Sequence, residues 1–228
     1  MTKERNMIFN EDCLETMKRL KDKSVDITLT DPPYNVGLKY AEHDDDMKNY
    51  YDWCDKWFVE LMRVSKAVYF TPGMKNINFW MQKKPVWTMC WFKSNQCSPS
   101  GLGGFNVWEP ILVFGKPKKV GQDGFSMPIA MQNDVGDHPC PKNLKAWRKL
   151  LIMISNENDL VYDPFMGSGT TAIACIKENR QYLGSEIDKT YFELANRRIE
   201  KELSQGNLFK PAGSGRQKIQ QTALFTKD

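Results

Sequence analysis

The segment Asp31-Pro32-Pro33-Tyr34 places a carboxylate, two rigid prolines and an aromatic ring directly after the β-branched run Val25 to Thr30. Because prolines cannot continue a sheet interior, Asp31 is expected where a strand opens into a loop. A planar base with an exocyclic amine fits this segment. The carboxylate and a proline carbonyl accept the two amine hydrogens, which frees the nitrogen lone pair for attack, and the Tyr34 ring stacks on the base. A simple proline turn explains two of these residues but not all four, so we predict Asp31, Pro32, Pro33 and Tyr34 as catalytic residues.

A second segment, Asp163-Pro-Phe-Met-Gly-Ser-Gly-Thr-Thr171, contains glycines between an apolar strand and a helix. Such glycines let a ligand approach the backbone, and the helix that follows offers free N–H groups. A tight packing turn explains the glycines equally well. Glu186 follows the next strand about 20 residues on, where an acidic side chain accepts hydrogen bonds from a ribose diol. Since a phosphate-binding loop needs a lysine that is absent here, the two features favour an adenosine-containing cofactor.

These segments lie in a regular alternation of strands and helices. The expected strands are Asn6–Asn10, Val25–Thr30, Ala67–Phe70, Val86–Phe92, Val107–Phe114, Asp159–Tyr162 and Gln181–Ser185. The expected helices are Glu11–Leu20, Met47–Val64, Leu144–Ile154, Thr170–Glu178 and Asp188–Leu203. Strand, glycine turn, helix and strand form a parallel crossover unit. We therefore predict an α/β fold with one doubly wound, mostly parallel, seven-stranded sheet.

Composition narrows the class of protein further. The 228 residues, 41% of them hydrophobic, are enough for one packed domain, which we place at residues 1–203, followed by a polar, flexible C-terminal tail at 204–228. No apolar stretch is long enough to span a bilayer, and the N-terminus lacks a signal-peptide segment, so we expect a cytoplasmic protein. The net charge is +4, and the interval 83–120 holds six lysines and one acid, which suits a phosphate-facing side. Scattered cysteines and only two histidines, His43 and His138, predict no structural metal.

The catalytic segment, together with DPFMGSGTT and GSEID, resembles the S-adenosylmethionine-dependent amino DNA methyltransferases of the beta class, in which the catalytic motif precedes the cofactor motif. The resemblance extends to about Leu203. It includes Asn10-Glu11-Asp12-Cys13, whose Asp the family uses near the cofactor adenine. It also includes His138-Pro139-Cys140-Pro141-Lys142, whose Lys precedes a helix that flanks the cofactor, although Asn143 stands where the family has a second Pro.

The resemblance implies a Rossmann-like methyltransferase fold with S-adenosylmethionine as the cofactor and double-stranded DNA as the substrate. Ser168 and the turn amides would bind the methionine carboxylate, and Glu186 the ribose. The full set of expected cofactor residues is Asp12, Asp31, Lys142, Asp163, Phe165, Gly167, Ser168, Gly169, Thr170, Glu186 and Ile187.

The implied reaction transfers a methyl group to N6 of a flipped-out adenine at a short recognition sequence. The Asp-Pro-Pro-Tyr form is typical of the adenine enzymes and Ser-Pro-Pro-Tyr of the cytosine enzymes. A cytosine-N4 methyltransferase is the alternative within the family, and a catalytically idle DNA-binding protein of the same fold is the alternative outside it. As an enzyme of a restriction–modification system or an orphan enzyme, it is expected near the nucleoid of a bacterium, or in an archaeal or viral setting.

Two regions bear on partners. The interval 115–137 is short for a recognition insert, and its candidate base-reading side chains are Lys116, Lys118, Lys119, Gln122, Asp123, Gln132 and Asn133. We therefore predict a short recognition sequence or a homodimer that supplies a second surface. The tail repeats Gln-x-x-Leu-Phe at Gln205–Phe209 and Gln221–Phe225, which resembles peptides that dock on bacterial sliding clamps. Alternatively, Leu208 and Phe209 cap the last helix and the second copy is chance.

Overall fold

The computed structural model describes residues 6–37, 47–95, 98–99, 104–119, 121–129 and 142–208. Its strands are β1 (Met7–Phe9), β2 (Val25–Thr30), β3 (Ser65–Phe70), β4 (Trp87–Phe92), β5 (Ser98–Pro99), β6 (Phe105–Asn106), β7 (Trp108–Gly115), β8 (Gly124–Ser126), β9 (Leu160–Asp163) and β10 (Gln181–Ser185). Its helices are α1 (Cys13–Arg19), α2 (Tyr50–Val64), the 3-10 helix η1 (Met74–Asn76), α3 (Ile77–Met81), α4 (Leu144–Ile154), α5 (Thr170–Lys177) and α6 (Lys189–Leu208).

Eight of these strands form one sheet in the order β1-β10-β9-β2-β3-β7-β4-β8. All neighbours run parallel except β7, which is antiparallel to β3 and β4. From the central pair β9 and β2 the chain winds outward in opposite directions, to β10 through α5 and to β3 through α2. This point is the topological switch of the sheet, and ligands bind outside the carboxyl ends of the strands at such a switch.

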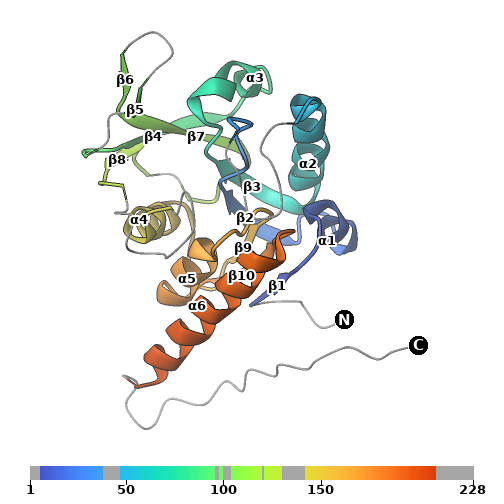
Figure 1. Cartoon of the computed structure of the whole chain (residues 1–228), viewed down its shortest axis with the longest axis vertical. Helices are drawn as coiled ribbons and strands as arrows, with labels where there is room; N and C mark the ends of the chain where they lie inside the picture. Colours follow the sequence, from blue (N-terminus) through green and yellow to red (C-terminus); the bar gives the residue numbers. More distant parts are fainter. Residues whose placement is uncertain are drawn as a thin grey trace.

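Helices cover both faces of the sheet (Figure 1): α1, α2 and α3 lie on one side, and α4, α5 and α6 on the other. On the side of α1, α2 and α3 the core is rich in aromatic residues, and the buried rings of Trp57, Phe70 and Trp80 contact one another. The other side packs Trp147 and Leu150 of α4 and Ala172 of α5 against the inner strands. Burying both faces makes the sheet a rigid support for the loops at its carboxyl edge.

The predicted doubly wound, mostly parallel architecture is confirmed, and the predicted bounds of the main elements differ from the observed ones by at most three residues at all but one end. The strand count was wrong by one, because β8 lies in the interval 115–137 and pairs with β4. Its Phe125 is buried against Trp91, an anchor that an isolated aromatic in a polar, glycine-containing segment does not reveal. The short elements η1, α3, β5 and β6 were also not predicted.

The C-terminal boundary also moves. Helix α6 continues to Leu208, five residues past its predicted end, so the first Gln-x-x-Leu-Phe copy begins inside a helix rather than in a tail. The second copy, and everything from residue 209 on, lies outside the described residues. None of the described helices is both long and apolar enough to cross a membrane.

The candidate base-reading lysines lie at the edge of the sheet opposite Asp31. Lys118 forms ion pairs with Asp26, near the start of β2, and with Asp159, just before β9. The backbone of Lys116 bonds to Lys66 at the start of β3. Because antiparallel β7 delivers this segment to the amino ends of its neighbours, these lysines lie across the sheet from Asp31. Gln132 and Asn133 are outside the described residues, as are His43 and His138.

Candidate active site

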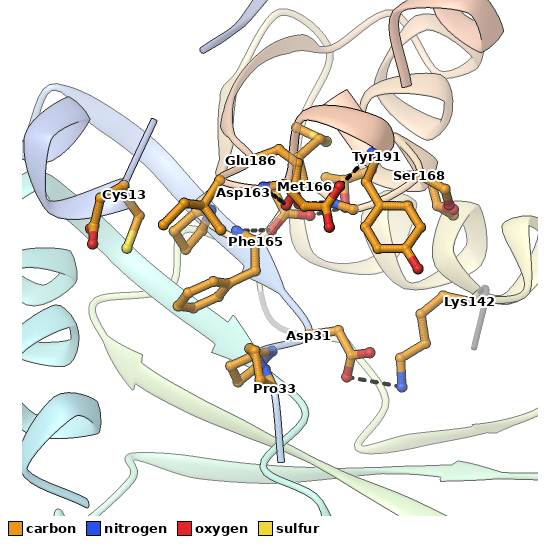
Figure 2. A pocket seen from close by; sticks show the side chains of 18 of the residues that line it. Cys13, Asp31, Pro33, Lys142, Asp163, Phe165, Met166, Ser168, Glu186 and Tyr191 are labelled. Atoms are coloured by element: carbon orange, nitrogen blue, oxygen red, sulfur yellow. Dashed lines mark hydrogen bonds and ion pairs between the residues drawn. The ribbon is translucent and has the colours of Figure 1, made fainter. Parts of the chain in front are cut away.

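A cavity of about 370 Å³ crosses the carboxyl ends of β10, β9 and β2. Figure 2 shows Glu186 and Ser168 on one side of it and Asp31 with Lys142 across from them. The volume lies within the range of small-molecule sites. The residues that line it include Asp12, Asp31, Pro32, Pro33, Tyr34, Lys142, Asp163, Phe165, Gly167, Ser168, Thr170, Glu186 and Ile187.

Glu186 forms the floor at one end of the cavity. Its two carboxylate oxygens accept hydrogen bonds from the backbone N–H groups of Gly167 (2.7 Å) and Asp188 (2.9 Å). Asn10, at the end of β1, donates to the carbonyls of Glu186 and Ile187 and so ties the two strand ends together. Burial raises the pKa of Glu186 to about 7, against which the two N–H donors act only in part.

Asp163 ends β9 and holds the glycine turn in place. Its Oδ1 accepts from the Thr30 hydroxyl (2.6 Å) and the Phe165 N–H (3.1 Å), and its Oδ2 accepts from the Thr171 hydroxyl (2.5 Å). Both oxygens are therefore occupied by the protein. Burial raises the pKa of Asp163 to about 6 despite these donors.

The glycine turn gives Gly169 a place of its own, outside the cavity lining. Its N–H donates to the carbonyl of Met166. Its φ of +82° and the Ala195 side chain, 3.0 Å from where a Cβ would stand, make it a packing glycine against α6. Thr170, the next residue, has a buried hydroxyl that lines the cavity and finds no partner within the described part of the chain. An unpaired buried hydroxyl at a helix N-terminus fits a polar ligand group.

Asp31 stands at the other end of the cavity and has two unlike oxygens. Oδ1 accepts hydrogen bonds from the hydroxyls of Tyr34 and Thr71, and it forms an ion pair with the ammonium group of Lys142 at 2.9 Å. No donor from the described residues reaches Oδ2, and the side chain is 25% exposed. One oxygen of Asp31 is anchored, and the other is free to meet a ligand.

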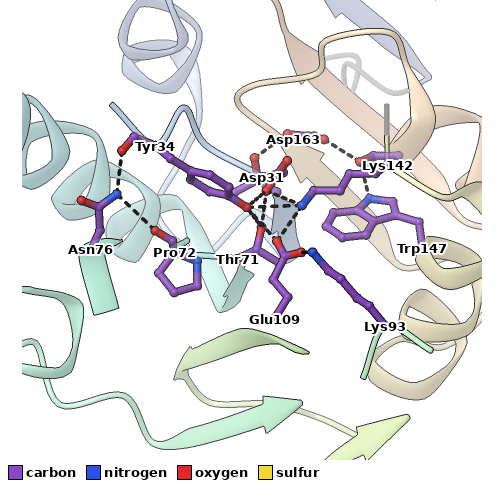
Figure 3. A network of polar contacts seen from close by, with 12 residues as sticks. Asp31, Tyr34, Thr71, Pro72, Asn76, Lys93, Glu109, Lys142, Trp147 and Asp163 are labelled. Atoms are coloured by element: carbon purple, nitrogen blue, oxygen red, sulfur yellow. Dashed lines mark hydrogen bonds and ion pairs between the residues drawn. The ribbon is translucent and has the colours of Figure 1, made fainter. Parts of the chain in front are cut away.

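Lys142 and Glu109 extend this arrangement into a polar network (Figure 3). Glu109, in β7, accepts from Lys142 on Oε1 (2.6 Å) and pairs with Lys93 through Oε2. Burial alone would raise the pKa of Glu109, but the two ammonium groups outweigh it and lower the pKa to about 2. The Tyr34 hydroxyl also lies 2.8 Å from Glu109 Oε1.

Tyr34 is held on one face. Gly73, after β3, has a φ of +67°, and a Cβ on it would stand 2.9 Å from the Tyr34 ring, so only glycine lets the ring lie against the backbone here. Asn76 donates to the Tyr34 carbonyl (2.9 Å), and Tyr50 donates to that of Pro33 (2.7 Å). Burial, followed by the charges of Asp31 and Glu109, raises the pKa of Tyr34 well above its usual value, so the hydroxyl stays protonated.

The structure thus brings together the predicted catalytic segment and, Gly169 excepted, all the predicted cofactor residues around one cavity. Lys142 lines it, but its charged group lies on Asp31 and Glu109. Asn143, which departs from the family pattern, caps α4 by accepting from the N–H groups of Lys145 and Ala146. Thr71 and Glu109 were not predicted as site residues; a single acid among the apolar residues of β7 was the available signal for Glu109.

Solved structures with this architecture define the class of the fold. The chain aligns with the crystal structure of the M1.HpyAVI–SAM complex at a TM-score of 0.65 and 24% identity, over 85% of this chain and 98% of that one. It aligns with the PvuII DNA methyltransferase (cytosine-N4-specific) at a TM-score of 0.66 and 16% identity, over 90% and 93%. The fold is the Rossmann-like fold of the methyltransferases.

Sequence comparison then identifies the family. The family model described as DNA methylase matches residues 25–197, and the chain belongs to this family of DNA methyltransferases. A curated relative, Type II methyltransferase M.HpaI from Haemophilus parainfluenzae, is 30% identical over 84% of this chain and 73% of its own length. DNA adenine methyltransferase YhdJ from Escherichia coli (strain K12) is 23% identical over 86% and 83%.

Proposed function

We propose that this DNA methyltransferase transfers a methyl group from S-adenosylmethionine to the exocyclic N6 amine of a flipped-out adenine in double-stranded DNA. The observation that carries the proposal is a single cavity with an acceptor for a ribose diol, Glu186, at one end and a free carboxylate oxygen, Asp31 Oδ2, at the other. A cofactor that spans these two points would place its reactive group beside an amine held by Asp31.

The residues around the glycine turn fit this cofactor. Glu186 would accept from the ribose hydroxyls, and Thr170 offers a buried hydroxyl without a protein partner in the described structure. Ser168 and the N–H groups at the start of α5 would hold the methionine carboxylate, and Asp12 and Ile187, which also line the cavity, would border the adenine. Asp163 supports the turn from below, and Phe165 supplies an apolar wall. When bound, the cofactor supplies an electrophilic methyl group.

The catalytic segment would hold the amine. Asp31 Oδ2 would accept one amine hydrogen, and the Pro32 carbonyl the other, since the Pro33 carbonyl already accepts from Tyr50. With Gly73 behind it, the Tyr34 ring offers its opposite face for stacking, which is worth about 1–3 kcal/mol per base. That stacking offsets part of the cost of extruding the base from the duplex, which is on the order of a few kcal/mol. The displacement at the methyl group then depends on alignment of the two reactants.

Adenine is favoured over cytosine by the residue that begins the catalytic segment. It is Asp31, as is typical of the adenine enzymes that the segment resembles, and one relative, YhdJ, is named as a DNA adenine methyltransferase. The PvuII enzyme, which shares the fold, acts on cytosine N4, so the fold leaves both bases open. N4 methylation of cytosine is therefore the second candidate.

The test is a methylation assay with purified protein, S-adenosylmethionine and long unmethylated DNA of mixed sequence. The DNA is digested to nucleosides and analysed by mass spectrometry, and methylated positions are mapped by sequencing. We expect N6-methyladenine at one short sequence. Detection of N4-methylcytosine alone would mean that cytosine rather than adenine is the target base. Cofactor binding by calorimetry without either product would identify an idle protein of the same fold.

A further inference from the structure

The polar network of Figure 3 contains one buried acid, Glu109, that does not line the cavity and yet contacts two groups that hold Asp31, the Tyr34 hydroxyl and the Lys142 ammonium group. We propose that Glu109 and Lys142 are positioning residues for methyl transfer, which hold Asp31 by its Oδ1 and thereby aim Oδ2 at the target amine. This inference rests on the proposed function and extends it to two residues that do not touch the reacting atoms.

The orientation of the Asp31 carboxylate is set by the groups that contact its Oδ1. A carboxylate oxygen has two lone pairs, and three donors converge on Oδ1: the hydroxyls of Tyr34 and Thr71 and the ammonium group of Lys142. Charge-assisted bonds of this kind are roughly twice as strong as neutral ones. With Oδ1 held from three directions, the plane of the carboxylate is fixed, and Oδ2 points where the described residues place no competing donor.

Lys142 is in turn held in place by Glu109. A lysine has a flexible four-carbon chain and loses about 2 kcal/mol of rotamer entropy when it is held in one place. Glu109 opposes this loss, because its Oε1 lies 2.6 Å from the Lys142 ammonium group, and both side chains are largely buried, at 6% and 14% exposure. Lys93 neutralises the other oxygen of Glu109. The two acids and two lysines balance, so the network can be buried without an unpaired charge.

Glu109 either positions its neighbours or transfers a proton, and its pKa distinguishes these two roles. Glu109 stays ionised at physiological pH, since Lys142 and Lys93 lower its pKa to about 2. An acid of this strength is a poor proton acceptor, so the Tyr34 hydroxyl between Asp31 and Glu109 does not serve as a path to a base. The remaining role for Glu109 is to fix the place of Lys142 and Tyr34.

The experiment compares Glu109→Gln and Lys142→Met with Lys145→Met, an exposed lysine in the first turn of α4. A displacement of about 1 Å can cost 10²-fold in rate, so we expect kcat to fall about 10- to 100-fold in the first two variants. The Kd for S-adenosylmethionine and the KM should stay within about twofold of the wild type, and Lys145→Met should match the wild type. Melting temperatures of all variants identify any general loss of folding.

The double variant Glu109→Gln/Lys142→Met provides the sharper readout. Each single change leaves the network with one unbalanced charge, whereas the double change removes one charge of each sign and leaves Asp31 and Lys93 in balance. If the two residues act as one unit, the double variant loses no more activity than the worse single variant. Multiplicative losses would overturn the proposal. A rise in the Kd for S-adenosylmethionine in Lys142→Met that accounts for its whole loss would return Lys142 to the cofactor.

A crystal structure of Glu109→Gln gives a readout that does not depend on activity. The proposal expects the Lys142 ammonium group to leave Asp31 and the carboxylate to lose its orientation. An unchanged contact between Lys142 and Asp31 would overturn it, even if the wild type were active. A wild type that methylates no DNA would defeat the proposed function, and the structure of the variant would still decide whether Glu109 positions Asp31.

Discussion

The two ends of the cavity bury carboxylates in opposite ways. Burial raises the pKa of Glu186 to about 7 and that of Asp163 to about 6, since the hydrogen-bond donors that reach these two carboxylates in the described structure are neutral N–H and hydroxyl groups. Burial acts on Glu109 as well, but the ammonium groups of Lys142 and Lys93 lower its pKa to about 2. Glu186 and Asp163, which line the cavity, and Glu109, which lies behind it, are all buried and thus differ by their partners rather than by their depth.

The difference separates two tasks. At the catalytic end, paired charges keep the network ionised and its geometry constant whether or not a ligand is bound. At the cofactor end, a carboxylate near its midpoint at neutral pH gains more from a ligand that donates hydrogen bonds or carries positive charge. On the proposed function, the catalytic end is therefore preorganised, and the cofactor end is completed by its ligand. Four predictions test this contrast, from the largest effect to the smallest.

Replacing Asp31 by Asn should have the largest effect. The variant keeps the size of the side chain but loses the charge that draws the target amine and pairs with Lys142. Removal of one preorganised polar contact at a reacting centre costs about 10²- to 10³-fold in kcat, and we expect a loss at least this large. Calorimetry should show nearly unchanged binding of S-adenosylmethionine. Loss of cofactor affinity in parallel with activity would mean that the two ends are not separate.

Replacing Glu186 by Ala should act on the cofactor instead. A ribose diol that loses a charged acceptor loses about 1.5–3 kcal/mol, or roughly 10- to 150-fold in Kd. At saturating S-adenosylmethionine, kcat should remain within a few fold of the wild type. Glu193→Ala, an exposed acid on α6, is the matched control. An unchanged Kd would place the adenosine elsewhere in the cavity.

The pH dependence of cofactor binding should follow Glu186. Its ionised form is the better acceptor for ribose hydroxyls, and with a pKa of about 7 it is mostly protonated at pH 6 and mostly ionised at pH 8. Affinity should therefore rise as the pH rises, by about tenfold over this range. The measurement is calorimetry at several pH values, and Glu186→Ala should remove most of the slope. A slope that survives in the variant would assign it to another group, with Asp163 the nearest candidate.

Replacing Tyr34 by Phe should have the smallest effect. Stacking survives, but the one hydrogen bond that the hydroxyl donates, shared between the Asp31 and Glu109 carboxylates, is lost, at about 0.5–1.5 kcal/mol, or roughly 2- to 12-fold in kcat. Tyr34→Ala should lose more, because it also removes the stacking surface. Equal losses in both variants, measured with the same DNA at saturating cofactor, would mean that the hydroxyl rather than the ring is the essential part.

Local patterns in the sequence were sufficient to predict most of the helices and strands. Strand β2 and helix α4 have the predicted bounds, because a β-branched run that ends at Asp31 and a stripe of apolar residues from Leu144 to Ile154 are signals contained within one element. Strand β8 and helix α3 were missed, because their stability comes from packing on β4 and on the aromatic-rich core rather than from their own residues. The fold class followed from the order of the elements.

The sequence alone identified the residues to which we assign the chemistry: Asp31 at a strand end, the glycine turn, and Glu186 at the end of the next strand. Only the tertiary structure decided which groups surround Asp31, since Thr71, Glu109 and Lys142 come from positions 40, 78 and 111 residues later in the chain. It also sent Lys116 and Lys118 to the opposite edge of the sheet, because β7 runs antiparallel. Contacts over such separations depend on strand order and direction, and no spacing within one segment encodes them.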